Sequence, residues 1–388
     1  MLLSLSNVPR DYAWGSHTLL AELEGRAPSA EPEAEVWFGD HPGDPADVAG
    51  DGTLDAVTGG TLPYLLKLLA AASPLSIQVH PTVEQARAGW ERETGLSLDD
   101  PERNYRDANH KPELIVALSE RFESLSGLRP VAETLRLLEI VGSSADPLRA
   151  RLSGDGDVLR DAIGWLLSGE AQGDVDVIAA AVGQASETES GEWADALRAV
   201  AGIADAYPGD PGVVVALLMN HVVLSRGEGV FLKAGLLHAY ISGLGVEIMA
   251  ASDNVLRGGL TPKRIDVPEL LSILDTTPGA VPVLRPSTGG AITEYPVGVP
   301  DFALRRVTLA GEPLTMPVRG PAMVLATAGD TAVSGADAVS RAVPVGHAVL
   351  ATEDESSLTL SGTGEVFIAT PGSLPEERER ARHADEAS

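Results

Sequence analysis

The feature that most constrains the fold is a change of pattern between residues 130 and 220. Apolar residues such as Leu135 and Leu138 recur there at helical spacing, and residues 159–167 and 193–200 have amphipathic patterns. On both sides of this block, short strand-like runs alternate with Gly and Pro turns. The block itself offers few side chains suited to catalysis. We therefore predict a mainly β protein that is interrupted by one all-helical insertion.

At 388 residues the chain exceeds what one ordinary hydrophobic core holds, so we expect two or three domains. The alternation over 285–370 is typical of an all-β sandwich or barrel. The charged C-terminal end is predicted to be disordered. The predicted segments are 1–125 and 223–284 for the two parts of a first β domain, 126–222 for the helical insertion, 285–375 for a C-terminal β domain and 376–388 for the tail.

Charge and composition exclude several classes of function. The net charge of −28 makes nucleic acid and anionic membranes poor partners, so an anionic substrate would need a local basic patch. The chain has no cysteine, and any metal must therefore bind through His, Asp, Glu or neutral oxygen. The first residues lack the pattern of a signal peptide, and the longest apolar run, 213–219, is too short to span a bilayer. We predict a cytoplasmic protein.

A strand predicted at residues 73–81 carries the first candidate site. Read at a period of two, Ser76, Gln78 and His80 share one face, and apolar residues share the other. This polar face suits solvent, which is the commoner outcome for one such strand taken alone. It equally suits the inside of a barrel that holds a metal or a sugar. Two later stretches with matching ligands favour the second interpretation.

Glu113 and His238 provide those matching ligands. Glu113 stands at the entrance of an apolar strand on the same face as Lys111, where a salt-bridged strand end is the simpler interpretation. His238 shares a strand face with Tyr240, and a single strand histidine is more often structural. Together with the first strand, however, these residues offer two imidazoles, a carboxylate and an amide oxygen, which suit a divalent ion such as zinc.

Cations gather in the glycine-punctuated loop 252–264. Arg257, Lys263 and Arg264 lie within eight residues of one another. Loop charges are usually solvated, and the alternative is a binding site for an anion. Only four of the 28 basic residues are lysine, so the chain uses arginine at most basic positions. A position that is lysine instead, such as Lys67 in an apolar run, is expected to require a compact and titratable ammonium.

Two acids and the early aromatic residues leave alternatives open. Glu247 interrupts an apolar strand. Glu35 is either a buried acid or an exposed strand residue, and its pattern favours exposure. Trp14, Trp37 and Phe38 are expected to be either core residues or a pocket wall, and core is the more frequent outcome.

Six motifs occur in order between Tyr12 and about Asp266: Tyr-Ala-Trp-Gly-Ser, Ala-Glu-Val-Trp-Phe-Gly-Asp-His-Pro, Ser-Ile-Gln-Val-His-Pro, Asn-His-Lys-Pro-Glu-Leu, Leu-His-Ala-Tyr-Ile-Ser-Gly and Ser-Asp-Asn-Val-Leu-Arg-Gly-Gly-Leu-Thr-Pro-Lys. Together they resemble the motifs of type I mannose-6-phosphate isomerases. The helical block and the C-terminal β region resemble that family in architecture rather than by motif. The resemblance implies a cupin fold: a jelly-roll barrel with zinc inside, a helical insertion and a second barrel.

The resemblance also implies roles for single residues. The ligands of one zinc ion per chain would be Gln78, His80, Glu113 and His238. The active-site arginine of the family falls on Arg257, which is followed by Gly258 where alanine is common. Arg264 stands where a bulkier aromatic residue is common, and it joins the candidates for substrate binding. The other implied pocket residues are Trp14, Ser76, Lys111, Tyr240, Glu247, Asp253 and Lys263.

The implied activity interconverts mannose 6-phosphate and fructose 6-phosphate through an enediol and feeds mannose and GDP-mannose metabolism. Arg257 and Lys111 would stabilise negative charge, whereas the proton shuttle stays open among Glu247, Lys111, Asp253 and a water linked to His238. The partner is then a small sugar phosphate, and we expect a monomer or weak homo-oligomer. The alternative from another class is a non-catalytic cupin that binds a sugar phosphate and holds a structural metal.

Overall fold

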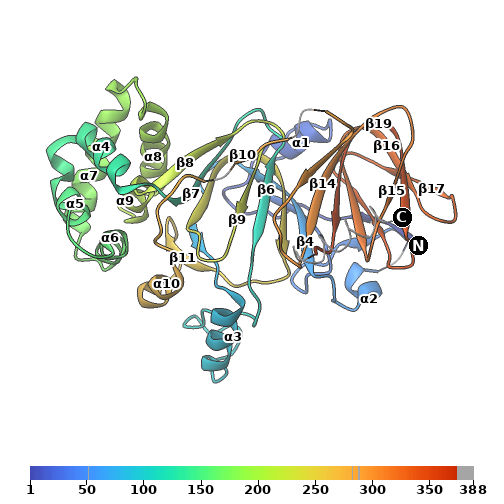
Figure 1. Cartoon of the computed structure of the whole chain (residues 1–388), viewed down its shortest axis with the longest axis horizontal. Coiled ribbons are helices and arrows are strands. Elements are labelled where there is room, and N and C mark those ends of the chain that lie inside the picture. Colours follow the sequence, from blue (N-terminus) through green and yellow to red (C-terminus); the bar gives the residue numbers. More distant parts are fainter. Residues whose placement is uncertain (51, 282, 287–288, 374–388) are drawn as a thin grey trace, which may run out of the picture.

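The computed structural model describes residues 1–388 except 51, 282, 287–288 and 374–388. A helical block, a first sheet and a second sheet follow one another along the longest axis of the molecule (Figure 1). The central pairs of both sheets are antiparallel, and the predicted mainly β class is confirmed. The tail predicted at 376–388 lies outside the described residues.

The first sheet is organised around its longest strand, which changes partners along its length. Its strands are β2 (Glu35–Phe38), β4 (Tyr64–Ala71), β5 (Ile77–Val79), β6 (Glu113–Ala117), β7 (Phe122–Leu128), β8 (Met219–Leu224), β9 (Gly229–Leu232), β10 (His238–Ala250), β11 (Leu256–Gly259) and β12 (Val283–Leu284). The first residues of β10 pair with β5 and β7, and the later ones pair with β4 and β6. The change falls at Gly243, whose φ is 122° and where a Cβ would lie 2.9 Å from Phe122 Cα.

The second sheet is formed mainly by the C-terminal part of the chain. Its strands are β1 (Leu2–Ser6), β3 (Asp47–Val48), β13 (Ile292–Tyr295), β14 (Ala303–Ala310), β15 (Leu314–Pro317), β16 (Ala322–Ser334), β17 (Ser340–Val343), β18 (Ala348–Ala351) and β19 (Ser357–Thr370). Its centre is the long antiparallel pair of β16 and β19. The predicted division assigned β1 and β3 to the first β domain, whereas β1 pairs with β18 and with β3 in this second sheet.

The helices of the described residues are α1 (Leu19–Leu23), α2 (Leu54–Thr58), α3 (Val83–Arg92), α4 (Val131–Val141), the 3₁₀ turn η1 (Gly142–Ala145), α5 (Asp146–Leu152), α6 (Val158–Leu167), α7 (Gln172–Thr188), α8 (Ala194–Ala206), α9 (Gly212–Leu217) and α10 (Val267–Ile273). Helices α4 to α9 form one block at one end of the first sheet, whereas α1 and α2 pack into a different core. Among the described residues, no helix has the length and apolar character required to cross a membrane.

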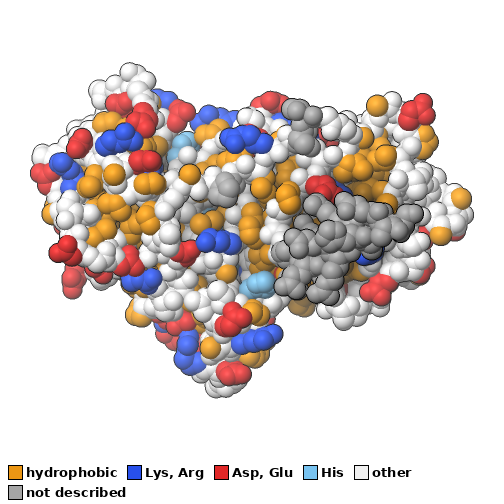
Figure 2. All heavy atoms as spheres, viewed as in Figure 1, with side chains coloured by type: hydrophobic (Ala, Val, Ile, Leu, Met, Phe, Trp, Pro, Cys, Tyr) orange, Lys and Arg blue, Asp and Glu red, His pale blue; other side chains and the backbone are white. Residues whose placement is uncertain are grey.

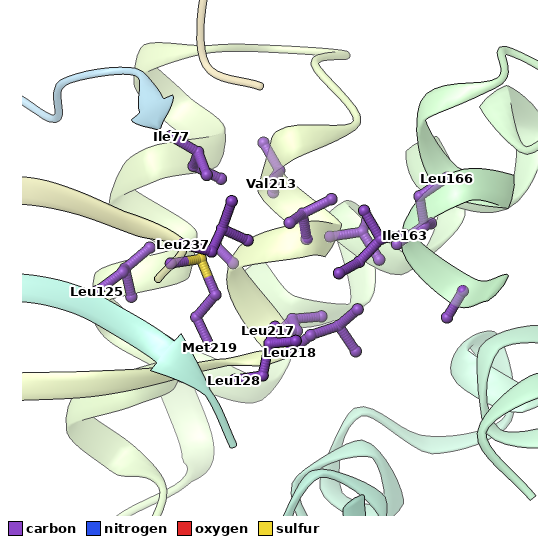
Figure 3. Packing of buried hydrophobic residues seen from close by; sticks show 14 of the residues in the cluster. Ile77, Leu125, Leu128, Ile163, Leu166, Val213, Leu217, Leu218, Met219 and Leu237 are labelled. Atoms are coloured by element: carbon purple, nitrogen blue, oxygen red, sulfur yellow. The ribbon is translucent and has the colours of Figure 1, made fainter. Parts of the chain in front are cut away.

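The helical block and the strands beside it share one hydrophobic core. Ile163 and Leu166 of α6 lie near Leu217 of α9, and the same core continues to Ile77 of β5 and to Leu237, next to the start of β10 (Figure 3). All five side chains are at least 99% buried. Core packing of this kind fixes side chains in single rotamers. Strand β5 and the start of β10, which carry Gln78 and His238, therefore pack against the helical block.

Helix α3 shows how local sequence sets an element boundary. Thr82 Oγ1 accepts a hydrogen bond from the Gln85 N–H at 3.2 Å, and Gln85 Oε1 accepts one from the Thr82 N–H at 2.8 Å. This capping box satisfies two donors at the start of the helix, and the helix ends at Arg92.

Candidate metal centre and active-site pocket

Three buried titratable side chains converge within the first sheet. His80 Nε2 lies 3.3 Å from Glu113 Oε1, and His238 Nε2 lies 3.3 Å from Glu113 Oε2. One possible ligand atom from each residue lies within 4.8 Å of the others. The register brings Gln78 directly opposite His238, and Gln78 lines the same pocket as Glu113 and His238. Its amide nitrogen donates to Ser76 Oγ at 3.1 Å, so the amide oxygen is the atom it can offer.

Both imidazoles are oriented by backbone carbonyls. His80 Nδ1 lies 2.7 Å from the Asn254 carbonyl oxygen, and His238 Nδ1 lies 2.9 Å from that of Leu236. Because a carbonyl only accepts, each Nδ1 carries the proton and each Nε2 presents a lone pair toward Glu113. Metal-binding histidines are held in this manner in proteins. His80 Nε2 is buried and has no hydrogen-bond partner among the described residues. No protein group among them therefore competes with a metal ion for this nitrogen.

The electrostatics of the group also suit a cation. Burial lowers the pKa of His80 to about 4, which keeps the imidazole neutral at pH 7. Burial alone would raise the pKa of Glu113, but the Lys111 ammonium and the neighbouring imidazoles hold that pKa well below its ordinary value. Lys111 Nζ lies 3.1 Å from Glu113 Oε1. The group therefore combines a neutral imidazole at His80 with an ionised carboxylate at Glu113.

Two adjoining pockets of about 520 Å³ each open in front of this group, and they share Lys67, Lys111, Arg257 and Lys263 in their walls. His80 lies behind them and is 1% exposed. The predicted residues in the inner pocket are Trp14, Ser76, Gln78, Lys111, Glu113, His238, Tyr240, Glu247, Arg257 and Lys263. Asp253 and Arg264 line the outer pocket. Residues from the whole span between 14 and 264 thus line these two adjoining pockets.

A buried ion network lies beside the candidate metal group. Lys67 Nζ lies 3.4 Å from Glu247 Oε2 and 3.6 Å from Glu35 Oε1. Trp37 Nε1 donates to Glu35 Oε2 at 2.7 Å, and the Tyr240 hydroxyl donates to Glu247 Oε1 at 2.8 Å. Burial raises the pKa of the Glu247 carboxyl. Lys67 was not among the predicted site residues, although a lysine within an apolar strand was the available signal.

Two expectations about single residues are corrected by these contacts. Glu35 is 6% exposed, whereas its pattern favoured exposure, because both of its carboxylate oxygens have buried partners. Trp14 is only partly buried and lines the inner pocket, so it forms a pocket wall rather than core. In both cases the neighbouring side chains belong to segments that are distant in sequence, so the local sequence pattern does not predict the burial of the residue.

Asp253 lies at the rim of the outer pocket and is already engaged. His41 Nε2 lies 3.0 Å from both carboxylate oxygens of Asp253. This contact with His41 lowers the pKa of Asp253, so the carboxylate is ionised near neutral pH. The side chain is 52% exposed. As a proton-transfer group it is less well placed than Glu247, which is buried and whose pKa is raised.

The cations of the loop 252–264 fall into two kinds. Arg264 Nη2 lies 3.0 Å from Glu102 Oε2 and 3.0 Å from Asp266 Oδ2, so its charge is neutralised locally. Arg257 and Lys263 line both pockets, and neither has a carboxylate within ion-pair distance among the residues that the structure describes. Of the three predicted cations, these two therefore keep charge available for an anionic ligand.

Comparisons with known proteins give a consistent result. The family profile described as phosphomannose isomerase type I, catalytic domain, matches residues 51–131. Mannose-6-phosphate isomerase of Escherichia coli (strain K12) is 36% identical over 388 residues, which cover 93% of this chain and 97% of that protein. Mannose-6-phosphate isomerase of Homo sapiens is 32% identical, with 79% of this chain and 82% of that protein covered.

Solved structures agree along almost the whole chain. A histidine-to-alanine variant of phosphomannose isomerase from Salmonella typhimurium superposes with a TM-score of 0.87 at 32% identity, covering 96% of this chain and all of that one. A mannose 6-phosphate isomerase bound with zinc and yttrium gives a TM-score of 0.85 at 33% identity, with the same coverage.

Proposed function

Because the chain belongs to the type I phosphomannose isomerase family, we propose that it interconverts D-mannose 6-phosphate and D-fructose 6-phosphate. The observation that carries this proposal is the buried His80–Glu113–His238 group, which opens into a pocket whose walls hold the unneutralised cations Arg257 and Lys263. An aldose–ketose isomerisation moves a proton between C2 and C1 through an enediol, and it needs an acid–base group and positive charge near the oxygens. This activity would feed mannose and GDP-mannose metabolism.

We propose that the group binds one Zn²⁺ per chain. The residues that would hold the ion are Gln78, His80, Glu113 and His238, and the donor atom His80 Nε2, buried without a hydrogen-bond partner among the described residues, supports this assignment. Two neutral imidazoles, a carboxylate and an amide oxygen form a donor set that zinc accepts. When bound there, the ion supplies positive charge that polarises or positions an oxygen of the sugar.

Arg257 and Lys111 are proposed to stabilise negative charge on the reacting oxygens. Burial lowers the pKa of Arg257, yet a guanidinium remains charged at neutral pH, so its contribution is electrostatic. The Lys111 ammonium lies beside Glu113 and lines both pockets, which places it between the metal group and the substrate space. Glu113 holds the Lys111 ammonium in place before substrate enters, so little reorganisation of this charge is needed as the enediolate forms.

Glu247 is the proposed proton-transfer group. Its carboxyl is 3% exposed, lines the inner pocket and has a pKa raised chiefly by burial, which moves it toward the working pH of a general base. The Tyr240 hydroxyl donates to one carboxylate oxygen and Lys67 lies near the other, so the carboxyl is held in place. Asp253 has the opposite properties, since His41 lowers its pKa and its side chain is half exposed.

Lys263 is proposed to receive the phosphate, because Arg264 is neutralised by Glu102 and Asp266. Trp14 and Ser76 line the inner pocket and would contact the sugar. We also propose a cytoplasmic monomer or weak homo-oligomer that works without nucleic acid, and the net charge of −28 supports the last point. Size-exclusion chromatography and cell fractionation test these proposals.

A coupled assay for fructose 6-phosphate tests the proposed activity. Zinc-loaded protein is supplied with mannose 6-phosphate in deuterium oxide, and both product formation and deuterium incorporation are followed. The enediol route predicts turnover with deuterium at the carbon that receives the proton. Binding of the sugar phosphate without any turnover would instead support the non-catalytic alternative, for which no feature of the described residues argues independently.

A further inference from the structure

A third cation, Arg106, lines the outer pocket together with Arg257 and Lys263. The three residues come from different segments: the loop between α3 and β6, strand β11, and the turn that follows β11. None of them has a carboxylate within ion-pair distance among the described residues. On the face shown in Figure 2, basic and acidic side chains are interspersed, and a pocket lined by three cations without carboxylate partners among the described residues differs from that pattern.

Two other arginines of the same pocket have structural roles, because protein groups already bind their guanidinium groups. Arg103 is 7% exposed, and its nitrogens donate to the carbonyl oxygens of Glu93, Leu96 and Tyr105. Arg264 is held by carboxylates, as described above. Arg106 differs from both, because its side chain is exposed and, among the described residues, makes no ion pair and donates a single hydrogen bond, from Nη1 to the backbone carbonyl of Leu98.

The three cations repel one another. The pKa of Arg257 is lowered first by burial and then by the charge of Arg106. The pKa of Lys263 is lowered first by the charge of Arg257, then by burial, and then by the charge of Arg106. In a chain with a net charge of −28, such a cluster costs free energy unless an anion occupies it. A phosphate monoester carries nearly two negative charges and several strong acceptor oxygens, which match guanidinium and ammonium donors.

The backbone of Arg106 is anchored to a buried side chain. Its backbone N–H donates to Asn254 Oδ1 at 2.8 Å, and Asn254 Nδ2 donates to the Asp107 carbonyl oxygen at 2.9 Å. Asn254 is fully buried and lies three residues before Arg257. One side chain therefore joins the loop of Arg106 to the segment of Arg257 and sets the spacing between the two backbone segments.

We propose that Arg106 binds the phosphate of the substrate together with Lys263, and that it determines the preference for phosphorylated over free hexose. This inference rests on the proposed function and names the residue that would select its substrate class. It is independent of the metal ligands, since it concerns the opposite end of the sugar phosphate.

Arg106→Gln and Arg106→Lys test the proposal, with Arg87→Gln as a matched control that removes the same charge from an exposed position on α3 outside both pockets. Arg106→Gln should raise KM for mannose 6-phosphate about tenfold, as expected for a lost charged hydrogen bond, and should change kcat far less. Arg106→Lys should recover much of the loss. Arg87→Gln should match the parent protein. Zinc content should be equal in all four proteins.

A second measurement separates this inference from the proposed function. Inorganic phosphate binding to the zinc-loaded proteins is measured by calorimetry, which requires no turnover. The parent protein could lack isomerase activity while Arg106→Gln still lowers phosphate affinity about tenfold. That result would overturn the proposed function and keep the anion site. An active parent whose KM and phosphate affinity are the same in Arg106→Gln and Arg87→Gln would keep the function and overturn the role of Arg106.

Discussion

Lys67 allows the energetics of the site to be tested directly, because its ammonium lies between two buried carboxylates. Nζ lies 3.6 Å from Glu35 Oε1 and 3.4 Å from Glu247 Oε2, and each of the three side chains is less than a tenth exposed. Removing one partner of a buried ion pair leaves an uncompensated charge and costs about 3–5 kcal/mol. Lys67→Met keeps most of the apolar stem and therefore isolates the loss of charge.

The size of the effect on melting temperature follows from chain length. Unfolding entropy is about 2.1 cal/mol/K per residue, which amounts to roughly 0.8 kcal/mol/K for this chain. Lys67→Met should therefore lower Tm by about 4–6 °C in calorimetry at pH 7. All proteins are measured with the same excess of zinc, because ligand binding shifts Tm by mass action. Lys233→Met is the control, since Lys233 is 60% exposed and its pair with Asp275 should contribute less than about 1 kcal/mol.

A second substitution checks that the cost comes from the buried charges. Glu247→Gln in the Lys67→Met background removes one of the two isolated carboxylates, so it should restore part of the lost stability. A Lys67→Met protein that melts within about 1 °C of Lys233→Met would refute the reasoning. The conclusion would then be that water reaches the network or that the carboxyls take up protons without cost.

Three further predictions address the metal, the chemistry and the stability. His80→Ala should lower zinc affinity by orders of magnitude, so that metal analysis after dialysis against a chelator finds almost none, and unchanged metal content would contradict the ligand assignment. Arg257→Ala should lose about a hundredfold or more in kcat at nearly constant KM and normal zinc content, with little recovery in Arg257→Lys, and near-normal kcat would exclude the proposed role. The hydrogen bond with His221 is the main reason why the pKa of Glu123 is lowered to about 2 from 4.5, so its contribution is present above pH 4.5 and is lost as pH falls toward 2. Urea unfolding should therefore show a deficit for Glu123→Gln at pH 6 that shrinks by pH 3, and a deficit independent of pH would rule out this linkage.

The chemistry of the candidate metal site was accessible from sequence, but its assembly was not. Strand periodicity predicted that Gln78 and His80 share a face, and the same rule applied to His238 separately. Nothing in the local patterns indicated that β5 would pair with the start of β10 or that β6 would pair with its end. Only the resemblance to a family linked the segments, and the register in the structure supplies the physical cause.

The features that the sequence did not predict have one cause in common: they depend on contacts with residues that are distant in the sequence. Arg264 and Lys263 are neighbours and looked equivalent, yet only Arg264 meets carboxylates, because Glu102 and Asp266 lie beside it. The strand Leu2–Ser6 likewise has an ordinary alternating pattern that fits either sheet, and its pairing with β18 spans more than 340 residues. Such contacts depend on the global arrangement rather than on local propensity.

Strand β10 shows most clearly why a period of two fails at a functional site. Strict alternation would put Glu247 on the face opposite to His238 and Tyr240, since their positions differ by an odd number of residues. In the structure all three line one pocket, and the Tyr240 hydroxyl donates to Glu247 Oε1 at 2.8 Å. The register of β10 against β7 shifts between Tyr240 and Ser242, and Gly243 follows with φ at 122°. A one-residue irregularity of this kind moves every later side chain to the other face, so the bulge is what brings the proposed proton-transfer group to the side of the metal ligands.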